Sequence, residues 1–315
     1  MHLPSERDLA IEDALRGTAD QFERSGDGGW RLVVAGGART VLHARIVDDD
    51  WLVADLYRAW SARSWWPLLQ LNAGLDGCVR LTSAQGRGLE VRGEIFIDGE
   101  VPASARDQPS LLERVAGMCC DVVSAGRQIV GLRADESNAT DSLTPADPEA
   151  LMRVCRDAGW EARALDSGRV QVTLDTRSTQ CRATLSFSAG GRLHAVAPLT
   201  TSPSLSPESQ DAIARALLAA SAQLRMVRGL AMHHDGGELA GLSFAGERHE
   251  ATAATIDCAL AALSVACRAV ELEVQALESA DLAREYLTIR GVYPANAVSP
   301  TTSFEQEDMP CLQLP

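Results

Sequence analysis

The chain has 315 residues, of which 46% are hydrophobic and 23% are charged, and its net charge is −14. All 29 basic residues are arginine, which excludes Schiff-base chemistry on a lysine and a lysine-containing phosphate loop. The acidic balance, without an arginine cluster, argues against a nucleic-acid partner. At this length about two domains are expected.

The first half begins with an amphipathic helix. Ser5 can cap it, with Asp8 three residues on, and its apolar stripe is expected to bury Ile11, Leu15, Thr18 and Phe22. The elements predicted after it are strands 30–34, 40–47 and 51–57, a middle helix containing Leu68, Leu69 and Leu75, strands 78–84 and 89–97, and a helix over 109–130.

The second half repeats this order. Asp147-Pro148 begins its first helix, which ends at Gly159, and Ser206-Pro207 begins its middle helix. The remaining predicted elements are strands 169–175, 181–188, 192–198, 226–233 and 238–244 and a helix over 254–277. The two long helices share one 4-3-4-3-4 apolar spacing, displaced by 145 residues: Leu111, Val115, Met118, Val122, Ala125 and Ile129 match Ile256, Leu260, Leu263, Cys267, Val270 and Val274.

These patterns predict an α+β protein with two tandem α-β-β-β-α-β-β-α domains. Each domain is expected to form an antiparallel sheet with its helices on one face, and the two domains are expected to form a pseudo-dimer. The predicted organisation is a first domain over 1–133, a linker over 134–146, a second domain over 147–289 with an extra C-terminal helix, and an extended or flexible tail over 290–315.

This element order on acidic halves, roughly 5–132 and 146–277, resembles the type III secretion chaperone-like superfamily, which includes CesT-type chaperones and the YbjN group. The resemblance implies a non-enzymatic homodimer that binds an extended segment of a client protein. Two copies in one chain imply that the dimer is internal. The YbjN-like members outside secretion are the closer analogy, because nothing in the sequence points to a secretion system.

A cluster of aromatic residues before the first middle helix is the candidate partner-binding site. Trp and Tyr bury large areas at low entropic cost, and the arginines among them could stack on the rings or meet an acidic client. The predicted site comprises Tyr57, Arg58, Trp60, Arg63, Trp65 and Trp66. In the alternative interpretation these aromatic residues pack between the two halves or cover a sheet edge, and the protein is a purely structural interaction module.

A second alternative is a metal-dependent enzyme or sensor. His233, Asp235 and His249 are the only grouping in the sequence that resembles a metal or acid–base site. We assign no catalytic residue, metal ligand or cofactor, because Gly36-Gly37 is followed by a strand and no helix is there to receive a phosphate.

The expected partner is a protein or peptide client, with no membrane. The longest apolar run, Cys258 to Cys267, is much shorter than a membrane-spanning helix, and no signal peptide is recognised, so we expect a cytoplasmic protein. The eight cysteines contain no CxxC pair and are expected to be small buried hydrophobes. The stripes on helices 109–130 and 254–277 could also support self-association.

Overall fold

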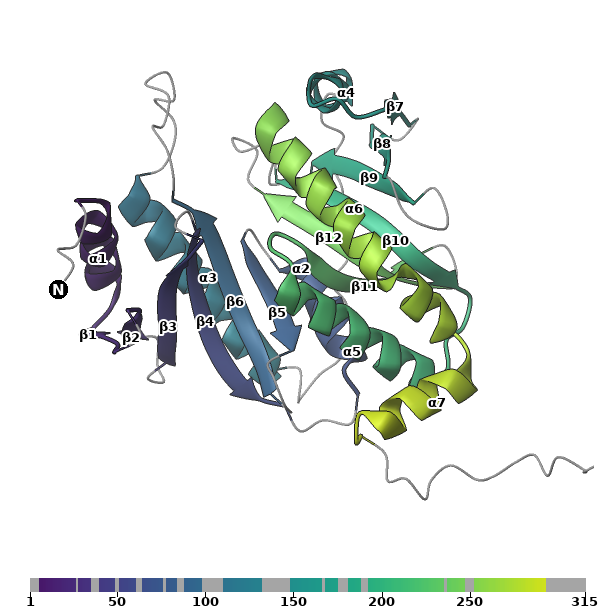
Figure 1. The fold of residues 1–315 in the computed structure, drawn as a ribbon, viewed down its shortest axis with the longest axis horizontal. Helices are drawn as coiled ribbons and strands as arrows, with labels where there is room; N and C mark the ends of the chain where they lie inside the picture. The colour runs from purple at the N-terminus through teal and green to yellow at the C-terminus, as the bar shows by residue number, and fades with distance from the viewer. Residues whose placement is uncertain are drawn as a thin grey trace, which may run out of the picture.

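The structure is a computed structural model with two six-stranded antiparallel sheets and helices packed on them (Figure 1). This confirms the predicted α+β class. The residues that it describes are 6–26, 28–34, 40–48, 51–60, 64–75, 78–83, 88–97, 110–131, 148–165, 168–174, 181–187, 192–234, 237–246 and 252–292.

The first half contains the predicted elements and one further strand. Its elements are α1 (Glu6–Thr18), β1 (Gln21–Arg24), β2 (Trp30–Val34), β3 (Thr40–Val47), β4 (Trp51–Ala59), α2 (Trp66–Gly74), β5 (Val79–Ser83), β6 (Gly88–Phe96) and α3 (Leu111–Gly131). The prediction that Phe22 lies on the first helix is wrong. That helix ends at Thr18, and Phe22 lies in β1 opposite Leu32, with the Arg16 guanidinium 5.0 Å from its ring centroid.

The second half also gains a short strand after its first helix. Its elements are α4 (Pro148–Asp157), β7 (Ala162–Ala164), β8 (Val170–Thr173), β9 (Arg182–Phe187), β10 (Leu193–Ser202), α5 (Pro207–Gln223), β11 (Arg228–His234), β12 (Gly237–Gly246), α6 (Ala253–Ala276) and α7 (Ala280–Ile289). The extra helix α7 packs on α5, where the Ser209 hydroxyl donates to the Glu278 carbonyl at 3.1 Å. The predicted linker 134–146 and the tail beyond Val292 lie outside the described residues, so the domain limits stay predictions.

The two sheets have the same strand succession. The first runs β1-β2-β3-β4-β6-β5, and the second, read from its outer edge, runs β7-β8-β9-β10-β12-β11. The added strands β1 and β7 occupy equivalent outer edges. The internal repeat read from the sequence therefore corresponds to a repeated topology, with one more strand per half than predicted.

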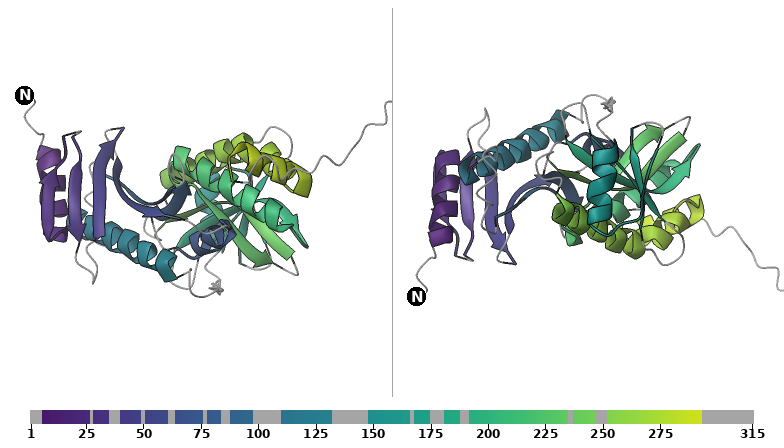
Figure 2. Two further views of the ribbon diagram at one scale, coloured as in Figure 1. Left: turned by 90° about the horizontal axis from the view of Figure 1, so that it is seen from below. Right: turned by 90° about the horizontal axis from the view of Figure 1, so that it is seen from above.

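Both long helices cover their own sheets. α3 and α1 pack together along one face of the first sheet, and α6 lies across β10 and β12 of the second (Figure 2). The 4-3 stripes are buried there, from Val115 to Ile129 in α3 and from Ile256 to Val274 in α6. Self-association through helices 109–130 and 254–277 would therefore have to use their outer faces, and it stays a prediction.

Among the helices of the described ranges, α6 is the one that is long and apolar enough to cross a membrane by length and composition alone. Core helices of soluble proteins pass the same test. The apolar stripe of α6 lies against the second sheet, while Val265 and Leu272 are exposed.

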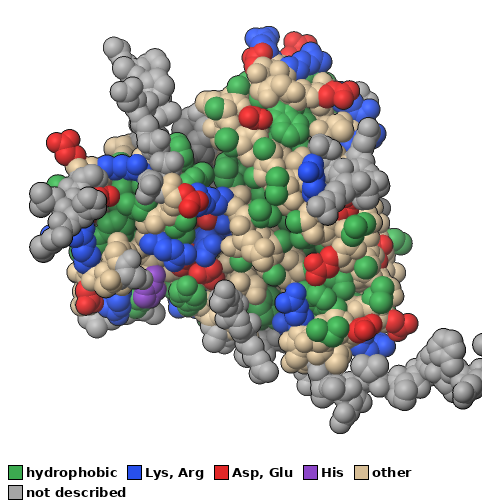
Figure 3. All heavy atoms as spheres, in the orientation of Figure 1, with side chains coloured by type: hydrophobic (Ala, Val, Ile, Leu, Met, Phe, Trp, Pro, Cys, Tyr) green, Lys and Arg blue, Asp and Glu red, His purple; other side chains and the backbone are tan. Residues whose placement is uncertain are grey.

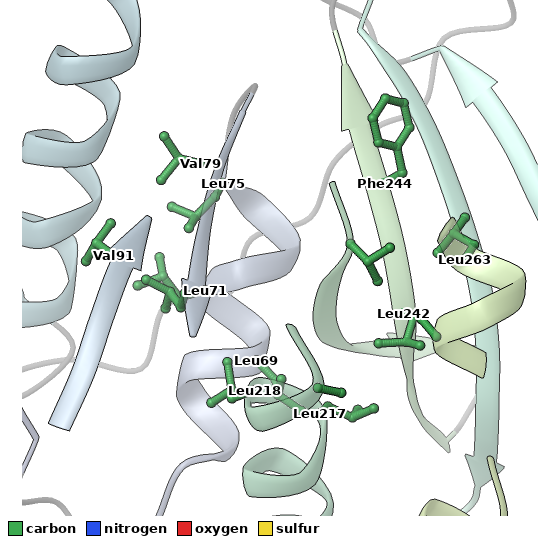
Figure 4. Packing of buried hydrophobic residues seen from close by; sticks show 14 of the residues in the cluster. Leu69, Leu71, Leu75, Val79, Val91, Leu217, Leu218, Leu242, Phe244 and Leu263 are labelled. Carbon is green, nitrogen blue, oxygen red and sulfur yellow. The ribbon is translucent and has the colours of Figure 1, made fainter. Parts of the chain in front are cut away.

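The middle helices cross between the halves. α2 packs against β11 of the second half, and α5 packs against β5 of the first. Figure 4 shows Leu69 of α2 beside Leu217 and Leu218 of α5. Both helices reach Gly229, where an added Cβ atom would stand 2.8 Å from the Leu217 Cβ atom and 3.0 Å from the Leu69 Cδ2 atom. Only glycine permits so close an approach.

Hydrogen bonds at this seam follow the repeat. The Asn72 side chain on α2 accepts from the Leu81 amide at 2.8 Å, and the Ser221 hydroxyl on α5 accepts from the Gly229 amide at 2.7 Å. The Asn72 side chain also donates to the Gly229 carbonyl at 2.7 Å and so joins the two halves directly. Asn72 and Ser221 are fully buried, so the loss of either bond would leave an unsatisfied polar group.

This reciprocal packing predicts that neither half folds stably alone. Fragments 1–133 and 134–315, expressed separately, would expose the apolar faces of α2 and α5 and of the strands they cover. We expect each fragment to lack a cooperative thermal transition, and an equimolar mixture to regain one, measured by circular dichroism. Cooperative unfolding of either isolated fragment would contradict the inference.

Candidate functional site

The three tryptophans of the predicted site are buried. Trp60, Trp65 and Trp66 are 7%, 4% and 5% exposed, whereas Tyr57 is 51% exposed. Arg63 lies outside the described residues. A side chain enclosed in the folded chain cannot anchor a partner on a free surface, so the expectation of an exposed tryptophan cluster is corrected here. Trp65 instead follows the alternative interpretation, in which the aromatic residues pack between the two halves.

Trp65 joins α2 to α5. It is the N-cap residue of α2 and has no capping side chain of its own. Its backbone amide donates instead to the Asp211 carboxylate on α5 at 2.7 Å. Arg215 pairs with the same carboxylate at 3.0 Å, and its guanidinium lies 4.5 Å from the Trp65 ring centroid. One half thus supplies the acceptor that the N-terminus of a helix in the other half requires.

Tyr57 and Arg58 lie on opposite faces of the first sheet, because successive residues of a strand alternate. The Arg58 side chain lies on the side of α3, where its Nη2 atom is 3.7 Å from the Cβ position of Gly126. Tyr57 lies on the other side. These two members of the predicted site therefore do not form one surface.

The face that carries Tyr57 is unusually rich in charge. Gly93 of β6 identifies this face. A Cβ atom on Gly93 would contact Met118 and Val122 of α3, so the odd-numbered residues of β6 face α3. The even-numbered residues of β6 therefore point away from α3. Strand register places the following residues together on this side, which we call the charged face: Arg31, His43, Arg45, Trp51, Val53, Asp55, Tyr57, Arg80, Thr82, Glu90, Arg92, Glu94 and Phe96. Figure 3 shows arginine and acidic side chains gathered over the first sheet.

A network of ion pairs lies at the centre of the charged face. Asp55, which is fully buried, pairs with Arg92 at 2.8 Å and with Arg45 at 2.7 Å. Arg92 also pairs with Glu90 at 2.8 Å, and Glu90 accepts from the Thr82 hydroxyl at 3.0 Å. Each buried carboxylate therefore has a cationic or hydroxyl partner, as a site with little water requires.

A second, bidentate pair lies beside it. Arg80 donates to both Glu94 oxygens at 2.7 Å, and both side chains are buried. Two parallel bonds of this kind fix geometry as well as charge. Together the two groups of ion pairs form a rigid charged layer on one face of the sheet.

Burial shifts the pKa values of this layer. It raises the pKa of the Asp55 carboxyl, the neighbouring Glu90 carboxylate raises it further, and Arg92 and Arg45 oppose the shift. Burial also lowers the pKa of the Arg80 guanidinium against the opposing effect of Glu94. For Arg92 burial acts in the same direction, but Asp55 and Glu90 outweigh it and the pKa is raised.

Aromatic rings flank the network along β4. The His43 and Tyr57 rings meet edge to face with centroids 6.1 Å apart, and the Trp51 and Phe96 rings do so at 5.3 Å. Arg225, from the loop after α5, lies 5.7 Å from the Trp51 ring centroid and forms an ion pair with Asp48. Tyr57 and Phe96 are exposed, so apolar surface is available on both sides of the charges.

The second half covers part of the charged face. Arg92 donates to the Ala222 carbonyl at 3.3 Å, and the Met226 amide donates to Glu94 at 3.4 Å. Met226 has a φ of 62°, a left-handed backbone conformation that residues other than glycine seldom adopt. The loop thus holds an uncommon backbone conformation while it contacts the first half.

The second sheet provides an internal comparison. In the first sheet one cross-strand row reads Asp55, Arg92 and Arg80, and the equivalent row of the second reads Val196, Ser243 and Arg228. By the same register Glu90 corresponds to Gly241 and Glu94 to Ala245. The same topology therefore forms without the carboxylates, so the fold itself does not require them.

The described part of the structure does not bring together the residues of the alternative metal-dependent site. His233 is exposed on β11, and Asp235 and His249 lie outside the described residues. Within the described ranges no group of three or more His, Cys, Asp or Glu side chains could hold a metal ion.

The described cysteines are buried, half-buried or exposed; Cys78 is the half-buried one, and Cys311 lies outside the described residues. Cys119, Cys155, Cys181 and Cys267 are buried, as expected, and burial raises the pKa of Cys119 to about 12 and of Cys155 to about 11. The expectation of burial is wrong for Cys120 and Cys258, which are exposed on the outer faces of α3 and α6. Adjacent helix residues point in different directions, which separates Cys120 from Cys119.

Comparisons with known proteins assign the chain to no family. No family model matches the chain, and no curated protein matches it significantly. Among solved structures it is similar to the di-domain ARO/CYC StfQ from the steffimycin biosynthetic pathway, at 10% identity over 90% of this chain and 94% of that one, with a TM-score of 0.15. A TM-score this low carries no argument about fold or activity.

The burial of the tryptophans predicts large losses of stability. Trp65→Ala and Trp66→Ala should each lower the free energy of unfolding by about 3–5 kcal/mol, as core truncations of aromatic residues do. The exposed Tyr57→Ala is the control and should cost less than about 1 kcal/mol. Denaturant titration followed by circular dichroism measures all three, and equal losses would contradict this assignment of buried and exposed rings.

The network predicts a different pattern. Arg92→Ala leaves Asp55 and Glu90 buried without their shared cation and should cost about 3–5 kcal/mol. Because the folded Asp55 has a raised pKa, it keeps a proton that the unfolded chain releases, so the loss should grow as the pH rises through that pKa and shrink in acid.

The matched control for Arg92→Ala is a triple variant. Asp55→Val/Glu90→Ala/Arg92→Ser resembles the second sheet and should stay within about 1 kcal/mol of the parent, since whole buried ion groups can often be replaced at little cost. A loss as large as that of Arg92→Ala would show that the network is needed for folding.

Proposed function

We propose that this chain is a non-enzymatic protein-binding module, chaperone-like or adaptor-like, which holds a segment of a client protein on the charged face. The observation that carries the proposal is the difference between the two halves. One sheet has a preorganised charged layer between exposed aromatic rings, and the other lacks its carboxylates, with Val196, Gly241 and Ala245 where the first sheet has Asp55, Glu90 and Glu94. A feature that costs desolvation and that the fold does not need is best explained by binding.

The client surface in this proposal differs from the six residues predicted from the sequence. It keeps Tyr57 and replaces the buried tryptophans with Phe96 and the half-buried Trp51. Rigid aromatic rings contribute contact area at low entropic cost, which suits them to anchor an extended segment. The buried tryptophans have the structural role of the alternative interpretation.

The proposal includes an internal pseudo-dimer. Repeated strand order, reciprocal packing of α2 and α5, and the matching hydrogen bonds of Asn72 and Ser221 support it. This arrangement agrees with the resemblance to the chaperone-like superfamily, whose members pair two such domains. A cytoplasmic location, a protein client, and a role without cofactor, membrane or nucleic acid remain part of the same proposal.

Affinity capture from the native host's lysate tests the function. The wild type should enrich a protein that Tyr57→Ala/Phe96→Ala fails to retain, because both exposed rings of the charged face are removed. The matched control is Val265→Ala/Leu272→Ala, which removes two exposed apolar side chains of α6 and should retain the same protein.

Mass spectrometry identifies the captured protein, and circular dichroism confirms that each variant is folded. No enrichment by the wild type under several growth conditions, or equal loss with both variants, would count against the proposal.

A further inference from the structure

The charges that solvent can reach on the charged face are mainly positive, although the whole chain is strongly acidic. Asp55, Glu90 and Glu94 are buried, whereas Arg45 is 43% and Arg31 44% exposed. Asp55 pairs with Arg45, whose side chain stays partly exposed, whereas Arg92 and Arg80 are largely enclosed. Arg31 is paired at the margin of the face, with Glu23.

Strand register places Arg31 in one row with the centre of the network, and Arg45 lies beside this row, two residues along β3 from His43. Arg31 lies opposite His43, His43 opposite Asp55, Asp55 opposite Arg92, and Arg92 opposite Arg80. Neighbouring strands are about 4.8 Å apart, so the part from β2 to β6 is roughly 14 Å long. This length suits about four residues of an extended peptide.

Two exposed acids of the described residues lie near this row, and both are already paired. Glu23 lies 3.6 Å from Arg31, and Asp48 forms an ion pair with Arg225. Both carboxylates lie at the margin, on β1 and at the turn before β4, and not within the row. The exposed Glu23–Arg31 pair contributes little, so a ligand carboxylate can compete for Arg31. Arg45 pairs with the buried Asp55, and its own side chain is 43% exposed to a ligand.

Resting on the proposed function, we infer that the client segment is acidic: an extended peptide with Asp or Glu side chains beside an aromatic or aliphatic residue. Its carboxylates pair with Arg31 and Arg45, and its apolar side chain packs on Tyr57 or on Phe96. Arginine is suited to this role because its planar fork binds carboxylates in two-bond geometry.

The net charge of −14 does not prevent this binding. At physiological ionic strength the Debye length is about 8 Å, so distant surface carboxylates are screened while the arginines in contact are not. Higher salt should weaken the complex, because these contacts are only partly buried.

The test is a selection from a random peptide library displayed on phage, with the full-length chain as target. We expect sequences enriched in Asp and Glu next to Phe, Tyr, Trp or Leu. A synthetic copy of the recovered peptide should bind at least about tenfold more weakly to Arg31→Glu/Arg45→Glu, measured by fluorescence anisotropy. Arg127→Glu/Arg153→Glu, the control, changes the charge equally away from this face and should bind like the wild type.

The other outcomes separate the inference from the function it rests on. Recovered peptides that are neutral or basic, but whose binding is lost in Tyr57→Ala/Phe96→Ala, would overturn the acidic client and leave the binding face in place. Peptides unaffected by either pair of substitutions on the charged face, or no enrichment at all, would overturn both.

Discussion

The crossing of α2 and α5 is the constraint on which the rest of this structure depends. Each helix packs on a strand of the other half, and they meet over Gly229. That crossing buries Trp65 against Arg215, and it brings the loop after α5 onto the first sheet. The second half therefore covers part of the charged face, with the Arg92–Ala222 contact at the edge of the covered part, and it keeps water from the buried charges beneath.

Burial explains why these carboxylates are paired with arginines. A carboxylate such as Asp55 would be costly at this depth without a cation, and it has two, while Glu94 has a bidentate partner. Such a group adds little stability compared with apolar packing, and the second sheet forms the same topology without these carboxylates. What it does supply is a fixed position for a partly exposed guanidinium, that of Arg45, on which the proposed binding role depends.

Much of the fold could be predicted from the sequence, because apolar spacing and turn residues are local signals. The stripes of α3 and α6 and the repeat itself were visible in this way. β1 and β7 were not, since strands of four and three residues are too short to show an alternation. The candidate site was predicted only at Tyr57. The placement of Trp65 depends on contacts with residues more than a hundred positions away, Asp211 and Arg215, which no local pattern shows. Asp55, Arg92 and Glu90 come from separate strands, and only register joins them.

The pair Arg80 and Arg228 indicates how the two halves diverged in role. They occupy the same position in the repeat, and both are buried. Arg80 faces Glu94 within its own sheet, whereas Arg228, with Ala245 where a glutamate would be, donates to the Leu75 carbonyl of the other half at 2.6 Å. One arginine therefore builds the charged layer and the other closes the seam that keeps it dry. In a homodimer both copies of this arginine would have the same partners. In a single chain with two copies the partners can differ, so one half can carry the proposed site while the other half packs against it.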